Sequence, residues 1–208
     1  MGAKGEVTMD AFGIMNIVGL LAFAVVGSLR GSEADLDLLG VGVLGVMTAL
    51  GGGVTRDLLV NATPVALRSM GDVSVALVGV ALAVVLSRFG DDLTERPVVR
   101  IPDAIGLSAF ATTGALVAHD AGLTAFGVVL LATVTGVGGG LISDLLLQNV
   151  PSVLVEDFYA TCALLGGLAF WLLVDVGVGS QKSAVACAGI VLGLRLLAIR
   201  YDWELPTV

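Results

Sequence analysis

Charged side chains are scarce in this sequence of 208 residues. Only 13% of its residues are charged and 57% are apolar, against about 25% and about 45–50% in ordinary soluble domains. A water-soluble globule and a disordered chain are therefore both excluded. Basic side chains are fewest, with 10 Lys and Arg against 18 Asp and Glu and a formal net charge of -8. This balance excludes nucleic-acid binding, which needs a basic surface.

Cysteine and histidine are nearly absent. The two cysteines, Cys162 and Cys187, stand in apolar stretches as small buried side chains, so we expect neither a disulfide framework nor a metal site. The one histidine, His119, ends an apolar run beside Asp120, and no serine or cysteine stands in a motif that would pair with it. A nucleophile and base for hydrolysis are therefore missing from the sequence, and we expect that the chain is not an enzyme and binds no cofactor.

Long apolar runs make up most of the chain. A bilayer core of about 30 Å requires about 20 largely apolar helical residues per crossing. The runs are continuous rather than alternating, which favours helices over a membrane barrel. We therefore predict an all-α membrane protein, with residues 1–208 as one transmembrane domain that has no cleaved signal. Seven candidate spans meet the criterion: 11–29, 38–61, 73–87, 101–118, 123–148, 157–174 and 183–199.

Basic residues are divided unevenly between the two sides that seven crossings define. One side holds five arginines: Arg30, Arg88, Arg96, Arg100 and Arg200. The other side holds three basic residues: Lys4, Arg68 and Lys182. The positive-inside rule then predicts a multi-pass protein of a prokaryotic plasma membrane, with the N-terminus outside and the C-terminus in the cytoplasm.

A duplication is present in the chain. An ungapped offset of 87 residues aligns three features that composition bias does not easily produce: the triplets 51–53 and 138–140, Asp57 and Asp144, and Pro64 and Pro151. Each copy, about 11–88 and about 101–175, holds three predicted spans. The second copy would therefore cross the membrane upside down, an arrangement typical of transport proteins. The extra helix, about 183–200, would close the bundle or contact a neighbouring protomer.

Three consecutive glycines are a weakness in a helix, because each costs about 1 kcal/mol relative to alanine. Two explanations are open. The small residues could allow close helix packing, or the helix could break or kink and turn carbonyl groups toward a water-filled cavity. Recurrence of the triplet, with an acid four residues after each, favours the second. The candidate pore or hinge residues are Gly51, Gly52, Gly53, Gly138, Gly139 and Gly140.

The two acids that follow the triplets are Asp57 and Asp144. Ionisable residues inside a span are costly and usually face the bundle interior or water. One carboxylate toward each side would concentrate cations and repel anions. Arg56 could neutralise Asp57, but Ser143 stands at the equivalent position, which predicts a more negative inner half.

Other polar residues have ordinary interpretations. Thr48 and Thr135, which precede the triplets, either offer hydroxyls to dehydrating ions or bond the preceding helical turn. Asp72 and Asp103 fall at predicted helix boundaries, where capping or interface placement suffices. Tyr159 stands near a span end, as in an aromatic belt.

The motif Gly-Gly-Gly-Val-Thr-Arg-Asp-Leu-Leu at 51–59 resembles the signature of the prokaryotic trimeric intracellular cation (TRIC) channels, and its echo at 138–144 followed by Pro151 is similar. The resemblance covers almost the whole chain. It implies a homotrimer with a pore in each protomer, conducting potassium and, less selectively, sodium. It also implies second and fifth helices bent at the glycines, and bound lipid. Ser143 departs from the arginine that prokaryotic relatives often carry in both repeats.

A carrier is the alternative to a channel. The same group of sequences has also been described as glycine transporters, and inverted repeats with broken helices suit a carrier as well. In that case Arg56 could hold the carboxylate of glycine or another small amino acid. For the channel, the expected partners are monovalent cations, membrane lipid and two further copies of the chain.

Overall fold

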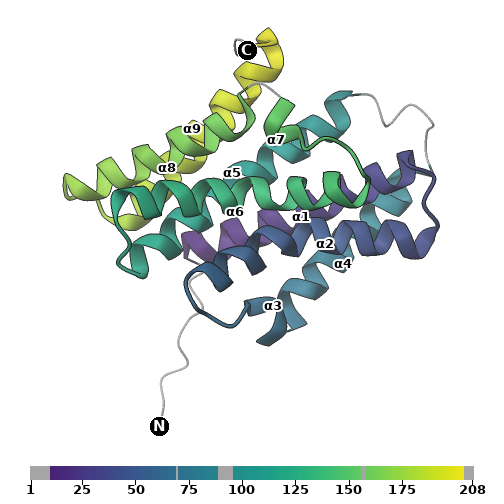
Figure 1. Cartoon of the computed structure of the whole chain (residues 1–208), viewed down its shortest axis with the longest axis horizontal. Coiled ribbons are helices and arrows are strands. Elements are labelled where there is room, and N and C mark those ends of the chain that lie inside the picture. The colour runs from purple at the N-terminus through teal and green to yellow at the C-terminus, as the bar shows by residue number, and fades with distance from the viewer. Residues whose placement is uncertain (1–9, 69, 89–95, 156–157, 204–208) are drawn as a thin grey trace.

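The computed structural model describes residues 10–68, 70–88, 96–155 and 158–203, and every regular element in those ranges is a helix (Figure 1). Lys4 and the first residue of the predicted span 157–174 lie outside the described residues. Each of the seven predicted spans corresponds to one long helix. The seven are α1 (Ala11–Glu33), α2 (Leu38–Leu59), α4 (Met70–Leu86), α5 (Arg96–Asp120), α6 (Ala125–Leu146), α8 (Tyr159–Asp175) and α9 (Ser180–Tyr201).

Two further helices of one turn each were not predicted, because four residues carry no periodic signal. They are α3 (Val65–Arg68) and α7 (Ser152–Val155), which follow α2 and α6. Among the described residues, five helices are long and apolar enough to cross a membrane, namely α1, α2, α6, α9 and residues 99–120 of α5. The remaining two, α4 and α8, are apolar but have 17 residues each. The chain is therefore a helical, multi-pass membrane protein.

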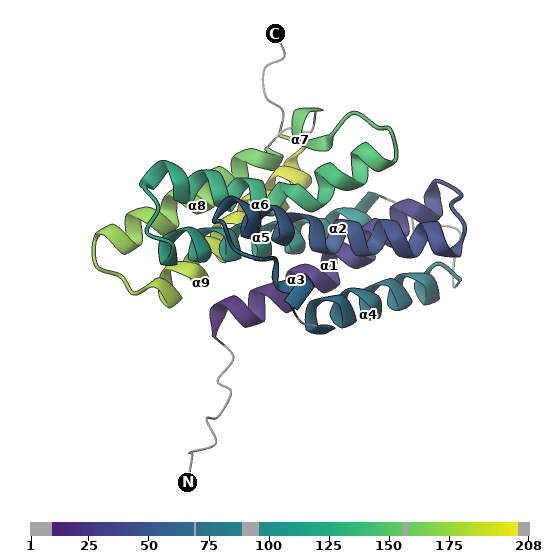
Figure 2. The same cartoon turned by 60° about the horizontal axis from the view of Figure 1, so that its bottom comes forward.

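Four helices form the centre of the bundle. The helix α1 packs against α2 and α5, and α6 packs against the same two helices. On one side α4 covers α1 and α2, while α8 and α9 lie on the other side (Figures 1 and 2). The helix α9 lies against both α5 and α8. It therefore closes the bundle next to α5.

The offset of 87 residues reappears in local structure. Asp37 caps the start of α2 and Thr124 caps the start of α6, each through a side-chain oxygen that accepts a backbone N–H three residues on. After the same two helices, Asn61 and Gln148 both adopt a left-handed backbone, with φ of 56° and 58°. Both halves thus run through the same order of helix, turn and single-turn helix.

The middle of the bundle is packed by two aromatic rings. Phe23 of α1 and Phe110 of α5 are fully buried, with ring centroids 5.3 Å apart and planes inclined by 63°. Each ring lies over a glycine of the facing helix: Phe110 over Gly19 and Phe23 over Gly106, where no Cβ would fit. Because no side chain at these glycines separates them, α1 and α5 approach closely, and the two buried rings fill the space between them.

Candidate functional site

The two glycine triplets form the contact between α2 and α6. A Cβ added to Gly52 would collide with the carbonyl oxygen of Thr135, and one added to Gly139 would collide with the carbonyl oxygen of Thr48. The contacts are reciprocal, so the two helices run antiparallel here. Because Asp57 follows Gly52 and Asp144 follows Gly139, the two acids lie toward opposite ends of the pair.

Of the predicted break or kink at the triplets, the structure contains no break. Helical hydrogen bonding continues through both of them, so α2 and α6 are each one uninterrupted helix. The alternative of close packing explains the glycines, since van der Waals contact between two backbones offsets their low helix propensity. A bend of the helix axis, which the family resemblance implies, stays a prediction.

The two threonines bond their own helices. Thr48 Oγ1 donates to Leu44 O and Thr135 Oγ1 donates to Leu131 O, both across 2.6 Å. Both residues are fully buried. Of the two interpretations of these hydroxyls, the bond to the preceding turn is the one that the structure contains.

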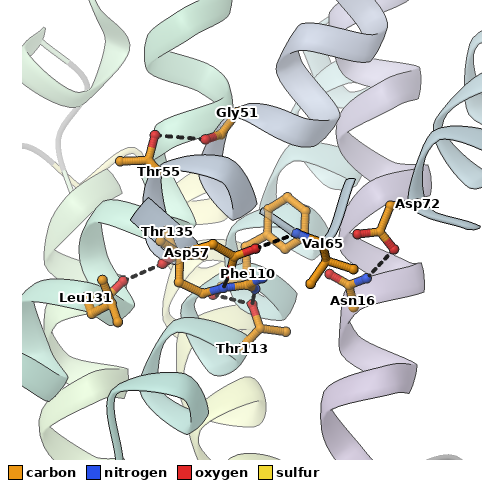
Figure 3. Close-up of polar contacts among 11 residues, drawn as sticks. Asn16, Gly51, Thr55, Asp57, Val65, Asp72, Phe110, Thr113, Leu131 and Thr135 are labelled. Atoms are coloured by element: carbon orange, nitrogen blue, oxygen red, sulfur yellow. Dashed lines mark hydrogen bonds and ion pairs between the residues drawn. The ribbon is translucent and has the colours of Figure 1, made fainter. Parts of the chain in front are cut away.

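Asp57 is held by an arginine and by a backbone N–H. Arg56 Nη2 lies 2.8 Å from Asp57 Oδ1, and Arg56 Nη1 donates to Thr113 Oγ1 of α5 across 3.1 Å. The other carboxylate oxygen accepts the N–H of Val65, the first residue of α3, across 2.9 Å (Figure 3). The guanidinium also lies 5.2 Å from the ring centroid of Phe12. The predicted pairing is present, and Arg56 is only 1% exposed.

A second acid lies close to this pair. Asp72, near the start of α4, accepts a hydrogen bond from Asn16 of α1 across 3.0 Å (Figure 3). Both residues line a small cavity of about 10 Å³ together with Gly53, Arg56 and Asp57. Such a cavity has room for about one water molecule. Asp72 lies at a helix boundary as predicted, in the first turn of α4, and its carboxylate also has a partner on another helix, Asn16 of α1.

At the other end of the helix pair, Asp144 lines a larger and more open cavity of about 440 Å³. Arg30 Nη1 of α1 lies 3.0 Å from Asp144 Oδ1. Both the N–H and the hydroxyl of Ser152, the first residue of α7, donate to Asp144 Oδ2 across 2.7 Å. Glu33 lines the same cavity. The single-turn helices α3 and α7 thus have the same role, since each binds the acid of its repeat.

The prediction that serine at 143 leaves its half more negative is wrong. Arg30 supplies the guanidinium for Asp144 from α1, and the hydroxyl of Ser143 is buried without a hydrogen-bond partner. Each cavity is lined by two carboxylates and one guanidinium: Asp57, Asp72 and Arg56 in the smaller, and Asp144, Glu33 and Arg30 in the larger. The two linings therefore carry the same formal charge.

Asp103 and Tyr159 also differ from their predicted surroundings. Asp103 is buried rather than at a helix boundary, and Tyr159 is buried rather than in an interfacial belt. Tyr159 Oη donates to Asp103 Oδ1 across 3.2 Å. The offset of 87 residues aligns these two with Asn16 and Asp72. The sequence does contain a signal for both hydrogen-bonded pairs, because the polar residues of one pair align with those of the other within apolar segments.

The residues considered for other chemistry lie apart from these cavities. His119 is exposed at the end of α5, with its ring centroid 6.0 Å from that of Phe170. Cys162 and Cys187 are buried free thiols, as predicted. Among the described residues, no group of three or more His, Cys, Asp or Glu could hold a metal ion.

Comparison with known proteins gives a consistent result. A family model described as "Glycine transporter" matches the chain twice, over residues 13–88 and 100–175, two segments separated by the offset of the duplication. A UPF0126 membrane protein of Deinococcus radiodurans is 41% identical over 196 residues, which cover 92% of this chain and 89% of the relative.

Solved structures agree with these relatives. One of them is a TRIC cation channel, described as showing the structural basis for conductance. It has a TM-score of 0.86 and 37% identity, and the match covers 94% of this chain and 96% of the channel's chain. The TRIC trimeric intracellular cation channel orthologue of Rhodobacter sphaeroides has a TM-score of 0.86 and 28% identity, covering 92% and 98%.

The apolar helices and the match to these solved structures show that the chain is a helical multi-pass membrane protein with the TRIC channel fold. The chain belongs to the prokaryotic TRIC channel family, to which the glycine transporter model also applies. Since this is a family of membrane channels, the expectation that the chain is not an enzyme is confirmed.

Proposed function

We propose that the chain is a monovalent cation channel that conducts potassium and, less selectively, sodium through a pore within each protomer. One observation carries this proposal. Asp57 and Asp144 lie toward opposite ends of the α2 and α6 pair, and each lines a cavity whose side chains sum to one negative charge. A water-accessible site of this sign attracts cations and repels anions on both sides of a narrow centre.

The narrow centre is the packed layer between the two cavities. Phe23, Phe110 and the facing glycines Gly52 and Gly139 fill it. Ions would cross it when α2 and α6 bend or separate at the glycines, where no side chains interlock. The proposed pore and hinge residues are those of the sequence motifs: Thr48, Gly51, Gly52, Gly53, Arg56, Asp57, Thr135, Gly138, Gly139, Gly140, Ser143 and Asp144.

Two inverted repeats fit the same proposal. Reciprocal contacts, such as Gly52 on Thr135 and Gly139 on Thr48, are what a two-fold relation between equivalent helices produces. We propose seven crossings, with α4 and α8 as the short ones, the N-terminus outside and the C-terminus in the cytoplasm of a prokaryotic cell. Residues 11–88 and 101–175 would be the repeats and residues 183–200 the added helix.

We further propose a homotrimer that binds lipid on its outer surface. The relative of Rhodobacter sphaeroides is described as trimeric. In this chain α2 exposes a row of large apolar side chains, which needs lipid or a neighbouring protomer: Leu38, Leu39, Val43, Met47, Leu58 and Leu59. No cofactor other than the permeant ion and lipid is part of the proposal.

A glycine or small amino-acid transporter is the second candidate, favoured by the description of the family model. The larger cavity offers both charges that a zwitterion requires, with Arg30 for the carboxylate and Glu33 or Asp144 for the ammonium group. Arg56, which the sequence indicated for the carboxylate, is buried and already bonded to Asp57 and Thr113.

Recording from the purified protein in planar bilayers tests the proposal. We expect single-channel steps in KCl, smaller steps in NaCl, and no change when glycine is added to either side. Radiolabelled glycine uptake into proteoliposomes is measured on the same preparation. Saturable uptake without channel steps would replace the channel by the carrier.

A further inference from the structure

A hydrogen bond joins the first and the last long helix of each repeat at equivalent positions. In the first repeat, Asn16 of α1 donates to Asp72 of α4 across 3.0 Å. In the second, Tyr159 of α8 donates to Asp103 of α5 across 3.2 Å. The offset of 87 residues aligns Asn16 with Asp103 and Asp72 with Tyr159. The donor is on the first helix of the first repeat and on the last helix of the second repeat, but both repeats have a hydrogen bond between these two helices.

The side chains that make the two bridges differ in size. Around Asp72, a carboxylate leaves a cavity of about 10 Å³ that Gly53 also lines. Tyr159 is 3% exposed, and its hydroxyl oxygen would lie 3.1 Å from a Cβ added to Gly140, the glycine equivalent to Gly53. In the second repeat, the phenol of Tyr159 therefore lies beside Gly140, whereas in the first repeat the small cavity lies beside the equivalent Gly53.

Tyr159 lies deeper in the bundle than the larger cavity. Asp144 lines that cavity, and Gly140 precedes Asp144 by four residues, about 6 Å along α6. Next to Gly140, Gly139 faces the Thr48 carbonyl in the packed centre, with no room for a Cβ between them. The Tyr159 hydroxyl beside Gly140 thus stands between the larger cavity and the centre.

The ring of Tyr159 also contacts Arg195 of α9. Its guanidinium carbon lies 4.7 Å from the ring centroid of Tyr159, and the residue is 4% exposed. A guanidinium over an aromatic face is attracted to it, more strongly where water is excluded. The first repeat carries a guanidinium within the motif, at Arg56, whereas the second has Ser143 there. The helix outside the duplication therefore supplies a cation to this half.

We propose that Tyr159 sets the width of the pathway in the half that contains Asp144, and that Asp103 and Arg195 hold it in the closing position. This inference rests on the proposed cation channel. An ion that moves from the larger cavity to the centre must pass the phenol. The ring therefore limits the size of the cation, and the bond to Asp103 favours the closed position.

Single-channel recording with K⁺ and with tetramethylammonium tests the role of Tyr159. In Tyr159→Phe we expect an unchanged unitary K⁺ conductance and about a fivefold higher open-to-closed ratio, the equivalent of about 1 kcal/mol for one lost hydrogen bond. In Tyr159→Ala we expect a higher K⁺ conductance and measurable tetramethylammonium current. Tyr201→Phe makes the same chemical change at an exposed site of α9 and should match the wild type.

The outcomes separate the inference from the proposed function. Wild-type steps, together with Tyr159→Phe and Tyr159→Ala proteins that keep the wild-type open ratio and cation size limit, would overturn the role of Tyr159 alone. A wild-type protein without channel steps would overturn both. If Tyr159→Ala does not assemble, the open-to-closed ratio of Tyr159→Phe decides, because that variant keeps the ring and its contact with Arg195.

Discussion

Asp144 of α6 is paired with Arg30 of α1, whereas Asp57, at the equivalent position of α2, is paired with its sequence neighbour Arg56. The two pairs differ in their surroundings. The side chain of Arg56 is 2% exposed and that of Arg30 is 17% exposed. Water in the larger cavity can therefore solvate Asp144 when its partner is removed, but Asp57 has only a narrow cavity beside it.

Arg56→Gln should destabilise the protein far more than Arg30→Gln. Loss of one partner of a buried ion pair costs about 3–5 kcal/mol, because the other charge stays buried. The Arg30–Asp144 pair is only partly buried and lines an open cavity, so water can solvate the remaining acid and the loss should be smaller. Thermal unfolding of both variants in one detergent, followed by tryptophan fluorescence, measures the difference. Equal midpoints for the two variants would show that burial does not distinguish the pairs.

Alanine at the triplet of α2 should have opposite effects at adjacent positions. At Gly52 the added methyl group meets the Thr135 carbonyl, so Gly52→Ala should lower stability by forcing α2 away from α6, and its K⁺ flux should differ from that of the wild type. At Gly53 the nearest atom is Arg56 Nη2 at 3.8 Å, an ordinary contact. Gly53→Ala should therefore be neutral or more stable by up to about 1 kcal/mol, the difference in helix propensity. The two variants are compared by unfolding midpoint and by K⁺ flux in liposomes.

Gly139→Ala provides the second test of that contact, because Gly139 faces the Thr48 carbonyl in the same manner. We expect the same loss of stability as for Gly52→Ala. Wild-type stability and flux in both variants would mean that the helices do not depend on this close approach.

Asp57→Asn and Asp144→Asn should each lower cation flux more than they lower folding, and Asp57→Asn should be the less stable of the two because Arg56 stays buried without its partner. Two unit charges 4 Å apart interact by about 1 kcal/mol in water, so loss of one carboxylate should lower the local cation concentration about fivefold. Asp120→Asn, exposed at the end of α5, removes the same charge far from both cavities and serves as the control. Unitary conductance in 0.1 M KCl is the measurement. Wild-type conductance in both Asp variants would place neither acid on the pathway.

The helices and the two acids could be predicted because they depend on local sequence. Long apolar runs set the positions of the helices, since a span needs a fixed length of apolar chain. The internal offset identified Asp57 and Asp144, and the structure places both at cavities. The single-turn helices α3 and α7 could not be predicted, because four residues carry no periodic signal, although each brings a backbone N–H to one of these acids.

The partners of the charged groups could not be predicted, because they come from distant parts of the chain. Arg30 and Asp144 are 114 residues apart in sequence. The helices continue through the triplets for a related reason: helix propensity is a local quantity, and the tertiary contact of α2 with α6 overrides it. Tyr159 was assigned to the interface from its distance to a span end, which says nothing about the helix face.

Ser143→Ala should stabilise the protein or leave its stability unchanged. The hydroxyl of Ser143 is fully buried without a hydrogen-bond partner, and such a group costs about 1–3 kcal/mol. Removing it leaves the Asp144 contacts intact, because these come from Arg30 and Ser152. Ser152→Ala is the matched control: it deletes a hydroxyl that donates to Asp144 across 2.7 Å and should lower the unfolding midpoint. Thermal unfolding of both variants in detergent provides the comparison. A Ser143→Ala protein less stable than Ser152→Ala would mean that the Ser143 hydroxyl does have a partner in the membrane, such as an ordered water.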